Sequence, residues 1–239
     1  MDKDKKESYK SNVSFSDALI MDSASEMEER KYILGEPSPT CYMNYLEQDK
    51  YGTTYNSDEF CLRGMKQYWL KKEEDSPQQI KNKEVASTFS PLSTFTKFRG
   101  KVRYHNLTKE ELGLLLWSIR LEKNSWMNLG KAKAYGYGYG AVKINIISAK
   151  NMNIKKAYSL TEFCLDPYED IEIDQMIDTY KTSMNTILKE QDIDTLLSVR
   201  TFFAMKDAEK ILDKSKTAYM SLNEYKQKNV LPKVTDLVD

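Results

Sequence analysis

Residues 96–119, TKFRGKVRYHNLTKEELGLLLWSI, contain the most regular pattern of the chain. Their first nine residues alternate apolar and basic side chains, and this alternation predicts a half-buried strand with a basic exposed face. Gly100 interrupts the alternation. The basic side chains of this face are Lys97, Arg99, Lys101 and Arg103.

The second part of the stretch predicts a helix. Thr108 and Glu111 have the spacing of a capping box, in which each residue satisfies a backbone N–H of the first helical turn. Apolar residues follow at helical spacing, and they are more typical of a core than of a ligand contact. These residues are Leu112, Leu115, Leu116 and Ile119.

A glycine-rich stretch, GKAKAYGYGYG, follows at residues 130–140, and residues 141–148 (AVKINIIS) again alternate as a strand would. Glycine lets a backbone approach a polymer closely, lysine attracts phosphate, and tyrosine offers a flat face for a base. The alternative is a turn whose tyrosines pack structurally. The stretch matches neither a Walker motif nor the GxGxxG dinucleotide pattern.

The charge of the chain is unevenly distributed along a sequence that is neutral overall. Residues 97–157 carry 13 basic and 3 acidic side chains, whereas residues 1–96 and 158–239 each carry an acidic excess. A concentrated basic segment attracts polyanions, because each lysine or arginine near a phosphate releases condensed counterions. The alternative is a merely solvated face.

Other features narrow the class of protein. The three cysteines are far apart and there is one histidine, so we expect reduced thiols, no metal site and no cofactor. The N-terminus is charged where a signal peptide needs an apolar core, and no apolar run could span a bilayer. We therefore expect a cytoplasmic protein that does not bind membranes.

The flanks of the basic segment differ from it. Residues 47–60 and 71–90 are polar and predict long loops. Residues 174–189 place apolar side chains on one helical face, further apolar stripes follow at 193–197 and 202–212, and Ser221 with Glu224 predicts another capping box. We expect this acidic tail to pack on protein rather than on RNA.

In order and spacing, the strand, the helix, the glycine-rich loop and the strand after it resemble the C-terminal half of a RAMP-superfamily CRISPR protein. The closest likeness is to the backbone subunit of type III effector complexes. The FSDA segment at residues 15–18, and the stretches at 34–46 and 62–69, are similar to upstream pieces of that family. The resemblance covers roughly residues 11–148.

The resemblance implies an α+β, ferredoxin-like domain over residues 1–157, with insertions at 47–60 and 71–96, and a helical C-terminal extension over 158–239. It implies that the glycine-rich loop contacts the backbone of a guide RNA. The loop residues concerned are Lys131, Lys133, Tyr135, Gly136, Tyr137, Gly138, Tyr139 and Gly140. Residues 71–96 would correspond to a loop that inserts at the guide–target duplex, with Phe89, Leu92 and Phe95 as wedges.

The FSDA segment lies close to the start of the chain, so much of the usual first half of such a domain is expected to be absent. Either another subunit completes the fold or the chain is a split or trimmed member. An incomplete sheet would leave an open edge, which favours assembly with other RAMP subunits.

Candidates for catalysis are few. Asp17 lies in the FSDA segment, and His105 follows the basic strand and could act as a general base on a ribose hydroxyl. The sequence therefore predicts a guide-RNA-binding subunit, possible contact with target RNA, and no secure catalytic residue. Two alternatives stay open: an endoribonuclease of the same fold that processes precursor guide RNA, and a protein-interaction module that does not bind RNA.

Overall fold

The structure is a computed structural model, and it describes residues 10–34, 41–49, 52–75, 86–136, 142–161, 165–189, 191–218, 220–227 and 229–238. The chain forms two compact units. Unit 1 comprises Met1–Glu26, Leu92–Leu121 and Asn145–Ile193, and unit 2 comprises Met27–Pro91, Glu122–Ile144 and Asp194–Asp239. Both units draw on residues before and after position 157, and the predicted division into a domain and an extension stays a prediction.

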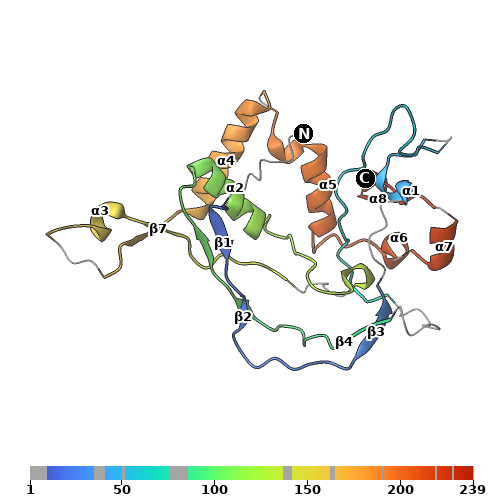
Figure 1. Cartoon of the computed structure of the whole chain (residues 1–239), viewed down its shortest axis with the longest axis horizontal. Coiled ribbons are helices and arrows are strands. Elements are labelled where there is room, and N and C mark those ends of the chain that lie inside the picture. The colour runs from blue at the N-terminus through green and yellow to red at the C-terminus, as the bar shows by residue number, and fades with distance from the viewer. Residues whose placement is uncertain are drawn as a thin grey trace, which may run out of the picture. The chain divides into compact units, whose positions relative to one another are not determined.

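Unit 1 contains three pairs of short strands and a pair of longer helices (Figure 1). Its elements are β1 (Val13–Phe15), β2 (Leu19–Ile20), β5 (Phe98–Arg99), β6 (Val102–Tyr104), α2 (Lys109–Arg120), β7 (Lys150–Met152), α3 (Ile154–Ala157), β8 (Tyr168–Asp170) and α4 (Ile173–Ile187). The elements of unit 2 are β3 (Arg30–Ile33), α1 (Tyr42–Tyr45), β4 (Ala86–Phe89), the 3-10 helices η2 (Lys133–Tyr135) and η3 (Ile193–Thr195), α5 (Leu197–Lys206), α6 (Lys214–Thr217), α7 (Leu222–Lys226) and α8 (Thr235–Val238), with η3 at its boundary with unit 1.

The predicted basic strand is confirmed as two short strands interrupted at Gly100, but the prediction that it is half-buried is wrong, because Phe98 and Val102 of its apolar face are exposed. It forms β5 and β6, which pair antiparallel with β2 and β1 respectively. The register places Phe15 opposite Val102 and Ile20 opposite Phe98. Among the described residues each of these pairs has two strands, so its outer edges are open.

The predicted helix is also confirmed, together with its capping box. The Thr108 hydroxyl accepts a hydrogen bond from the Glu111 N–H, and the Glu111 carboxylate accepts one from the Thr108 N–H. Figure 1 shows α2, in green, beside α4, in orange. Leu112, Leu116 and Ile177 are buried in this helix pair.

Gly113 determines how closely the two helices approach. A Cβ atom at this position would lie 2.1 Å from the Met176 carbonyl oxygen, a distance that no carbon can occupy. Trp117 packs on Tyr180, and an ion pair of 2.6 Å joins Arg120 to Asp174. Glycine therefore allows a backbone-to-backbone crossing that any other residue would prevent.

The core of unit 2 forms around two tyrosines. The rings of Tyr32 and Tyr135 lie 4.7 Å apart between their centroids, and Phe89 of β4 stacks on Tyr32. Strand β3 pairs antiparallel with β4 and places Tyr32 in this cluster. The cluster joins a strand near the start of the chain to the glycine-rich region a hundred residues later.

Two sequence predictions are wrong. Of the strand predicted at 141–148, residue 141 lies outside the described residues, Val142 makes an isolated bridge to Met127, and the remaining residues are not in a strand. The Lys143 side chain instead donates to the carbonyls of Lys123 and Ser125. The second error is the loop predicted at 71–90, because its residues 86–89 form strand β4. Residues 76–85 of this predicted loop lie outside the residues that the structure describes.

The predicted tail is helical in part: residues 193–195 form a 3-10 helix and residues 202–206 lie in α5, whereas residues 207–212 of the predicted stripe are not helical. Residues predicted at 174–189 form α4, although Ile187, assigned to its apolar face, is exposed. Ser221 and Glu224 exchange both bonds of a capping box at the start of α7. The fold of the described residues is therefore a mixed α+β arrangement with small antiparallel sheets and several helices.

Candidate nucleic-acid interface

The first element of the candidate interface is the basic ribbon, defined as β5 and β6 with their partners β2 and β1. Directly opposite residues of antiparallel strands share a face, so Arg103 lies with Ser14 and Val102 lies with Phe15. Lys97, Arg99, Lys101 and Arg103 are all exposed. Within the described part of the chain, none of the four forms an ion pair with a carboxylate.

The apolar positions of the ribbon are exposed as well. Phe15 is 69% exposed, Phe98 is 51% exposed, and Ile20, which lies opposite Phe98, is 47% exposed. Leu19 is exposed too, but it lies opposite Arg99 and so shares the basic face. A two-stranded ribbon is marginal in water unless its apolar face is covered. The ribbon therefore offers cationic side chains for a polyanion and an apolar face for a protein.

The second element is the start of the glycine-rich loop, residues 130–136. Tyr135 is buried, and its hydroxyl donates to the Ile33 carbonyl over 2.9 Å. The ring is therefore held in the core and cannot stack on a base in this conformation. Of the two roles that the sequence left open for the tyrosines, stacking on a base or packing in the structure, Tyr135 has the packing role.

Gly136 follows with a backbone conformation that suits glycine, with φ at +104°. A Cβ atom here would lie 2.6 Å from the Glu73 carbonyl oxygen and 2.9 Å from the Glu74 Cα. The loop thus passes directly against the segment at 73–75, and Asp75 N–H donates to the Tyr135 carbonyl. The sequence predicted that glycines of this loop let the backbone approach a bound polymer closely. At Gly136 the backbone instead approaches residues 73 and 74 of the same chain.

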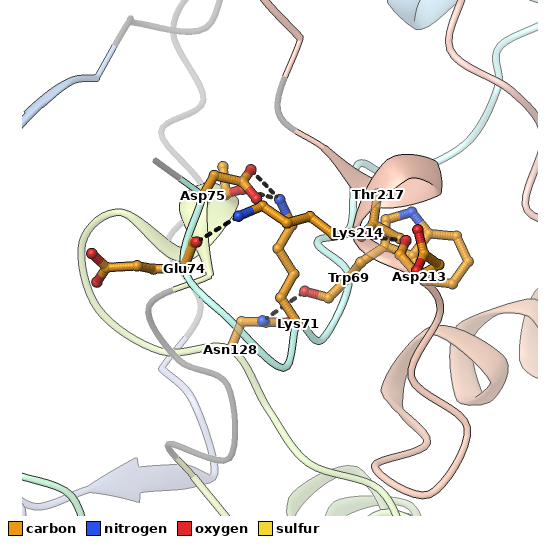
Figure 2. Close-up of polar contacts among 9 residues, drawn as sticks. Trp69, Lys71, Glu74, Asp75, Asn128, Asp213, Lys214 and Thr217 are labelled. Atoms are coloured by element: carbon orange, nitrogen blue, oxygen red, sulfur yellow. Dashed lines mark hydrogen bonds and ion pairs between the residues drawn. The ribbon is translucent and has the colours of Figure 1, made fainter. Parts of the chain in front are cut away.

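A buried lysine holds this contact, as Figure 2 shows. The Lys71 ammonium lies 2.6 Å from the Asp75 carboxylate and donates to the Ala134 carbonyl over 2.8 Å. Lys71 and Asp75 are both buried. The pair therefore ties Ala134, in the middle of the loop start, to residues 71–75. Lys214 of α6 also donates a hydrogen bond to the Glu74 carbonyl in that segment.

A second buried lysine lies at the other end of the loop start. Lys206, 2% exposed, donates to the Tyr68 carbonyl and to the Asn128 side-chain oxygen, both over 2.7 Å. Asn128 in turn donates to the Trp69 carbonyl, a bond drawn in Figure 2. Burial, and secondarily the nearby charge of Lys133, lowers the pKa of Lys206 from 10.5 to about 8.

Lys71 and Lys206 are functional candidates that sequence reasoning did not find. Lysine is rarely buried, and neither residue lies in a recognisable motif. Lys206 ends a helix, where a cation is ordinarily explained by the helix dipole. These two lysines can be recognised only from the structure, because the oxygens of Ala134, Tyr68 and Asn128 that accept their hydrogen bonds are far away in the sequence.

The remaining predicted residues are placed as follows. Lys131 is exposed and Lys133 is half-buried, with its ammonium 5.4 Å from the centre of the Tyr68 ring. Tyr137, Gly138, Tyr139 and Gly140 lie outside the described residues. Of the proposed wedges, Phe89 packs on Tyr32, whereas Phe95 is 95% exposed with a left-handed backbone (φ +67°).

The two catalytic candidates are not brought together. Asp17 lies beside Gly100, and the His105 N–H donates to the Asn12 carbonyl, so they flank opposite ends of the β1–β6 pairing. Both side chains are exposed. The described residues contain no group of three potential metal ligands.

Comparison with known proteins leaves function to be inferred from the residues themselves. No family model matches the chain, and no curated protein sequence matches it. None of the helices in the described ranges is long and apolar enough to cross a bilayer.

Proposed function

We propose that this chain is a guide-RNA-binding subunit of a type III-like CRISPR effector complex, built on a ferredoxin-like RAMP domain. One observation carries the proposal: the basic ribbon exposes Lys97, Arg99, Lys101 and Arg103, and the described residues supply no carboxylate to neutralise them. A row of unneutralised cations at strand spacing suits a phosphate backbone.

The anchored loop start supports the same function. Lys131 is exposed, and the residues after it are held by Lys71, Tyr135 and Gly136. An RNA-binding loop gains affinity when its base is already ordered, because less conformational freedom is lost on binding.

The exposed apolar face of the ribbon supports assembly with other RAMP subunits. Phe15, Ile20 and Phe98 would be covered by a neighbouring chain, and the open strand edges would pair with it. In this arrangement the apolar face of the ribbon contacts protein and its cations contact the guide RNA.

The test is the affinity of the full chain for single-stranded RNA as a function of salt. Replacing Lys101 and Arg103 by glutamine removes two phosphate contacts, so affinity falls and the slope of log K against log[salt] decreases by about 1.4. The matched control replaces Lys210 and Lys226, two exposed lysines of unit 2, by glutamine, and should behave like the wild type. Equal slopes for the two variants, or no RNA affinity at low salt, would contradict the proposal.

The same experiment tests the endoribonuclease alternative. RNA that stays intact after long incubation with the wild-type chain supports binding without cleavage. Cleavage that His105→Ala or Asp17→Ala abolishes would instead identify a nuclease. The separation of these two residues along the ribbon favours the first result.

A further inference from the structure

Three lysines converge on one tyrosine of unit 2. The Lys66 and Lys133 ammoniums lie 5.3 Å and 5.4 Å from the centre of the Tyr68 ring, and Lys206 donates to the Tyr68 carbonyl. They come from three separate segments: the stretch before Lys71, the glycine-rich loop, and the end of α5. We call these three side chains the Tyr68 lysine cluster.

The cluster carries positive charge that nothing nearby cancels. In the described part of the chain, no carboxylate forms an ion pair with Lys66, Lys133 or Lys206. The polar partners of Lys206 are two neutral oxygens, and the Phe202 ring lies 6.0 Å from its ammonium. Lys71 offers the contrast, because its buried ammonium is paired with the Asp75 carboxylate.

Such an arrangement is costly without an anion. Like charges repel, and a charge removed from water needs a counter-charge or several good acceptors. The pKa of Lys206 is lowered mainly by burial and secondarily by the nearby charge of Lys133. A bound anion would relieve the repulsion between Lys133 and Lys206 and would give the Lys66 ammonium a counter-charge.

We propose that the Tyr68 lysine cluster binds one phosphodiester group of the guide RNA, with Lys66 and Lys133 as direct ligands and Lys206 as the buried charge behind them. The inference rests on the proposed RNA binding and adds Lys66 and Lys206, which lie outside both the basic ribbon and the glycine-rich loop. Lys66 is exposed and Lys133 half-buried, so both ammoniums can move from the ring to a phosphate. Lys206 lies too deep to be a ligand and acts as a positioning residue.

The test replaces Lys66 by glutamine in the full chain and measures affinity for single-stranded RNA at several salt concentrations. Lys66 is exposed, so the variant is expected to fold. Affinity should fall several-fold, and the salt slope should decrease by about 0.7, the value for one lost phosphate contact on a single strand. The matched control is Lys72→Gln, an exposed lysine of the same segment, which should leave both quantities unchanged.

The outcomes separate this inference from the function it extends. If RNA binds and Lys66→Gln matches Lys72→Gln, the inference is overturned while RNA binding stands. If the wild type does not bind RNA at low salt, the proposed function fails, and inorganic pyrophosphate then decides the site. A rise in the melting temperature of the wild type with pyrophosphate, absent in Lys66→Gln, supports an anion site; equal behaviour of both proteins overturns it.

Discussion

The α2–α4 helix pair and the start of the glycine-rich loop are held together by opposite means. The helices meet through apolar side chains and a glycine, with Leu112, Leu116 and Ile177 buried and the backbones in contact at Gly113. The loop start is held by a hydrogen bond from buried Lys71 to the Ala134 carbonyl, and buried Lys206 holds Asn128, just before it, through the side-chain amide oxygen. Apolar packing tolerates small shifts, whereas a buried ammonium requires its acceptors at defined positions.

The difference suggests a division of tasks. Helix packing stabilises unit 1 without prescribing one exposed geometry. The Lys71 bond to the Ala134 carbonyl fixes the path of residues 130–136, and the Lys206 bonds join Tyr68 to Asn128 just before them, at the cost of burying charge. A loop that presents lysines and glycines to a phosphate backbone needs that fixed path more than it needs stability.

Breaking the Lys71 contact should have the largest effect on stability. Lys71→Met leaves the buried Asp75 carboxylate without this ammonium and the Ala134 carbonyl without its donor. We expect a loss of about 3–5 kcal/mol in the free energy of unfolding, measured by urea denaturation. Lys72→Met, one residue further along and exposed, is the control, and equal losses in the two variants would contradict the account.

Breaking the helix crossing should cost somewhat less. Gly113→Ala forces a Cβ atom against the Met176 carbonyl and the Tyr180 side chain, so the helices must separate. We expect a loss of about 1–3 kcal/mol, measured by thermal unfolding. Leu114→Ala, at the exposed position next to it, should change stability less; a Gly113→Ala variant as stable as wild type would disprove the close crossing.

Much of the helix pair could be predicted from sequence, because capping and helical periodicity are local. Thr108, Glu111 and the leucines after them indicated α2 correctly, and the basic strand was found with its break at Gly100. The resemblance indicated a strand leading into the FSDA segment, where β1 lies, but the pairing of β1 with β6 and the acceptors of Lys206 could not be found, because these contacts join residues far apart in the chain. Tyr135 is an example of what the sequence could not decide, because a tyrosine beside glycines can either stack on a base or pack in the core. Its hydrogen bond to the Ile33 carbonyl and its contact with the Tyr32 ring show that it packs in the core.

The strand predicted at 141–148 failed for a related reason. Alternating apolar and polar residues indicate that a segment could form a strand. The strand forms only if a neighbouring segment has free backbone N–H and C=O groups to pair with it. Beyond Val142 no described segment supplies one, and Lys143 bonds to carbonyls at 123 and 125. Function was predicted from charge and resemblance, and it stays a proposal.

The buried charge of Lys206 should make stability depend on pH. Its pKa is about 8 in the folded chain against 10.5 in the unfolded one, so the unfolded chain binds more protons between these values. The free energy of unfolding should therefore rise with pH across this window, by about 1–3 kcal/mol relative to Lys206→Met. Urea denaturation at pH 7.5, 9 and 10 measures this, and parallel pH profiles for the two proteins would contradict it.

The smallest expected effect is at the start of α2. Thr108→Ala removes the acceptor for the Glu111 N–H and half of the capping box. We expect a loss of about 1 kcal/mol, measured by thermal unfolding. Thr94→Ala, at an exposed position in a turn, is the control, and an unchanged melting temperature for Thr108→Ala would show that the box contributes nothing.

RNA binding is the central claim, and the most direct measurement is the nucleic acid content of the assembly purified from the cells that encode this chain. A guide-binding subunit should be recovered with other RAMP subunits and with a short RNA of uniform length. Recovery of the chain free of nucleic acid, or with RNA of random length, would contradict the account.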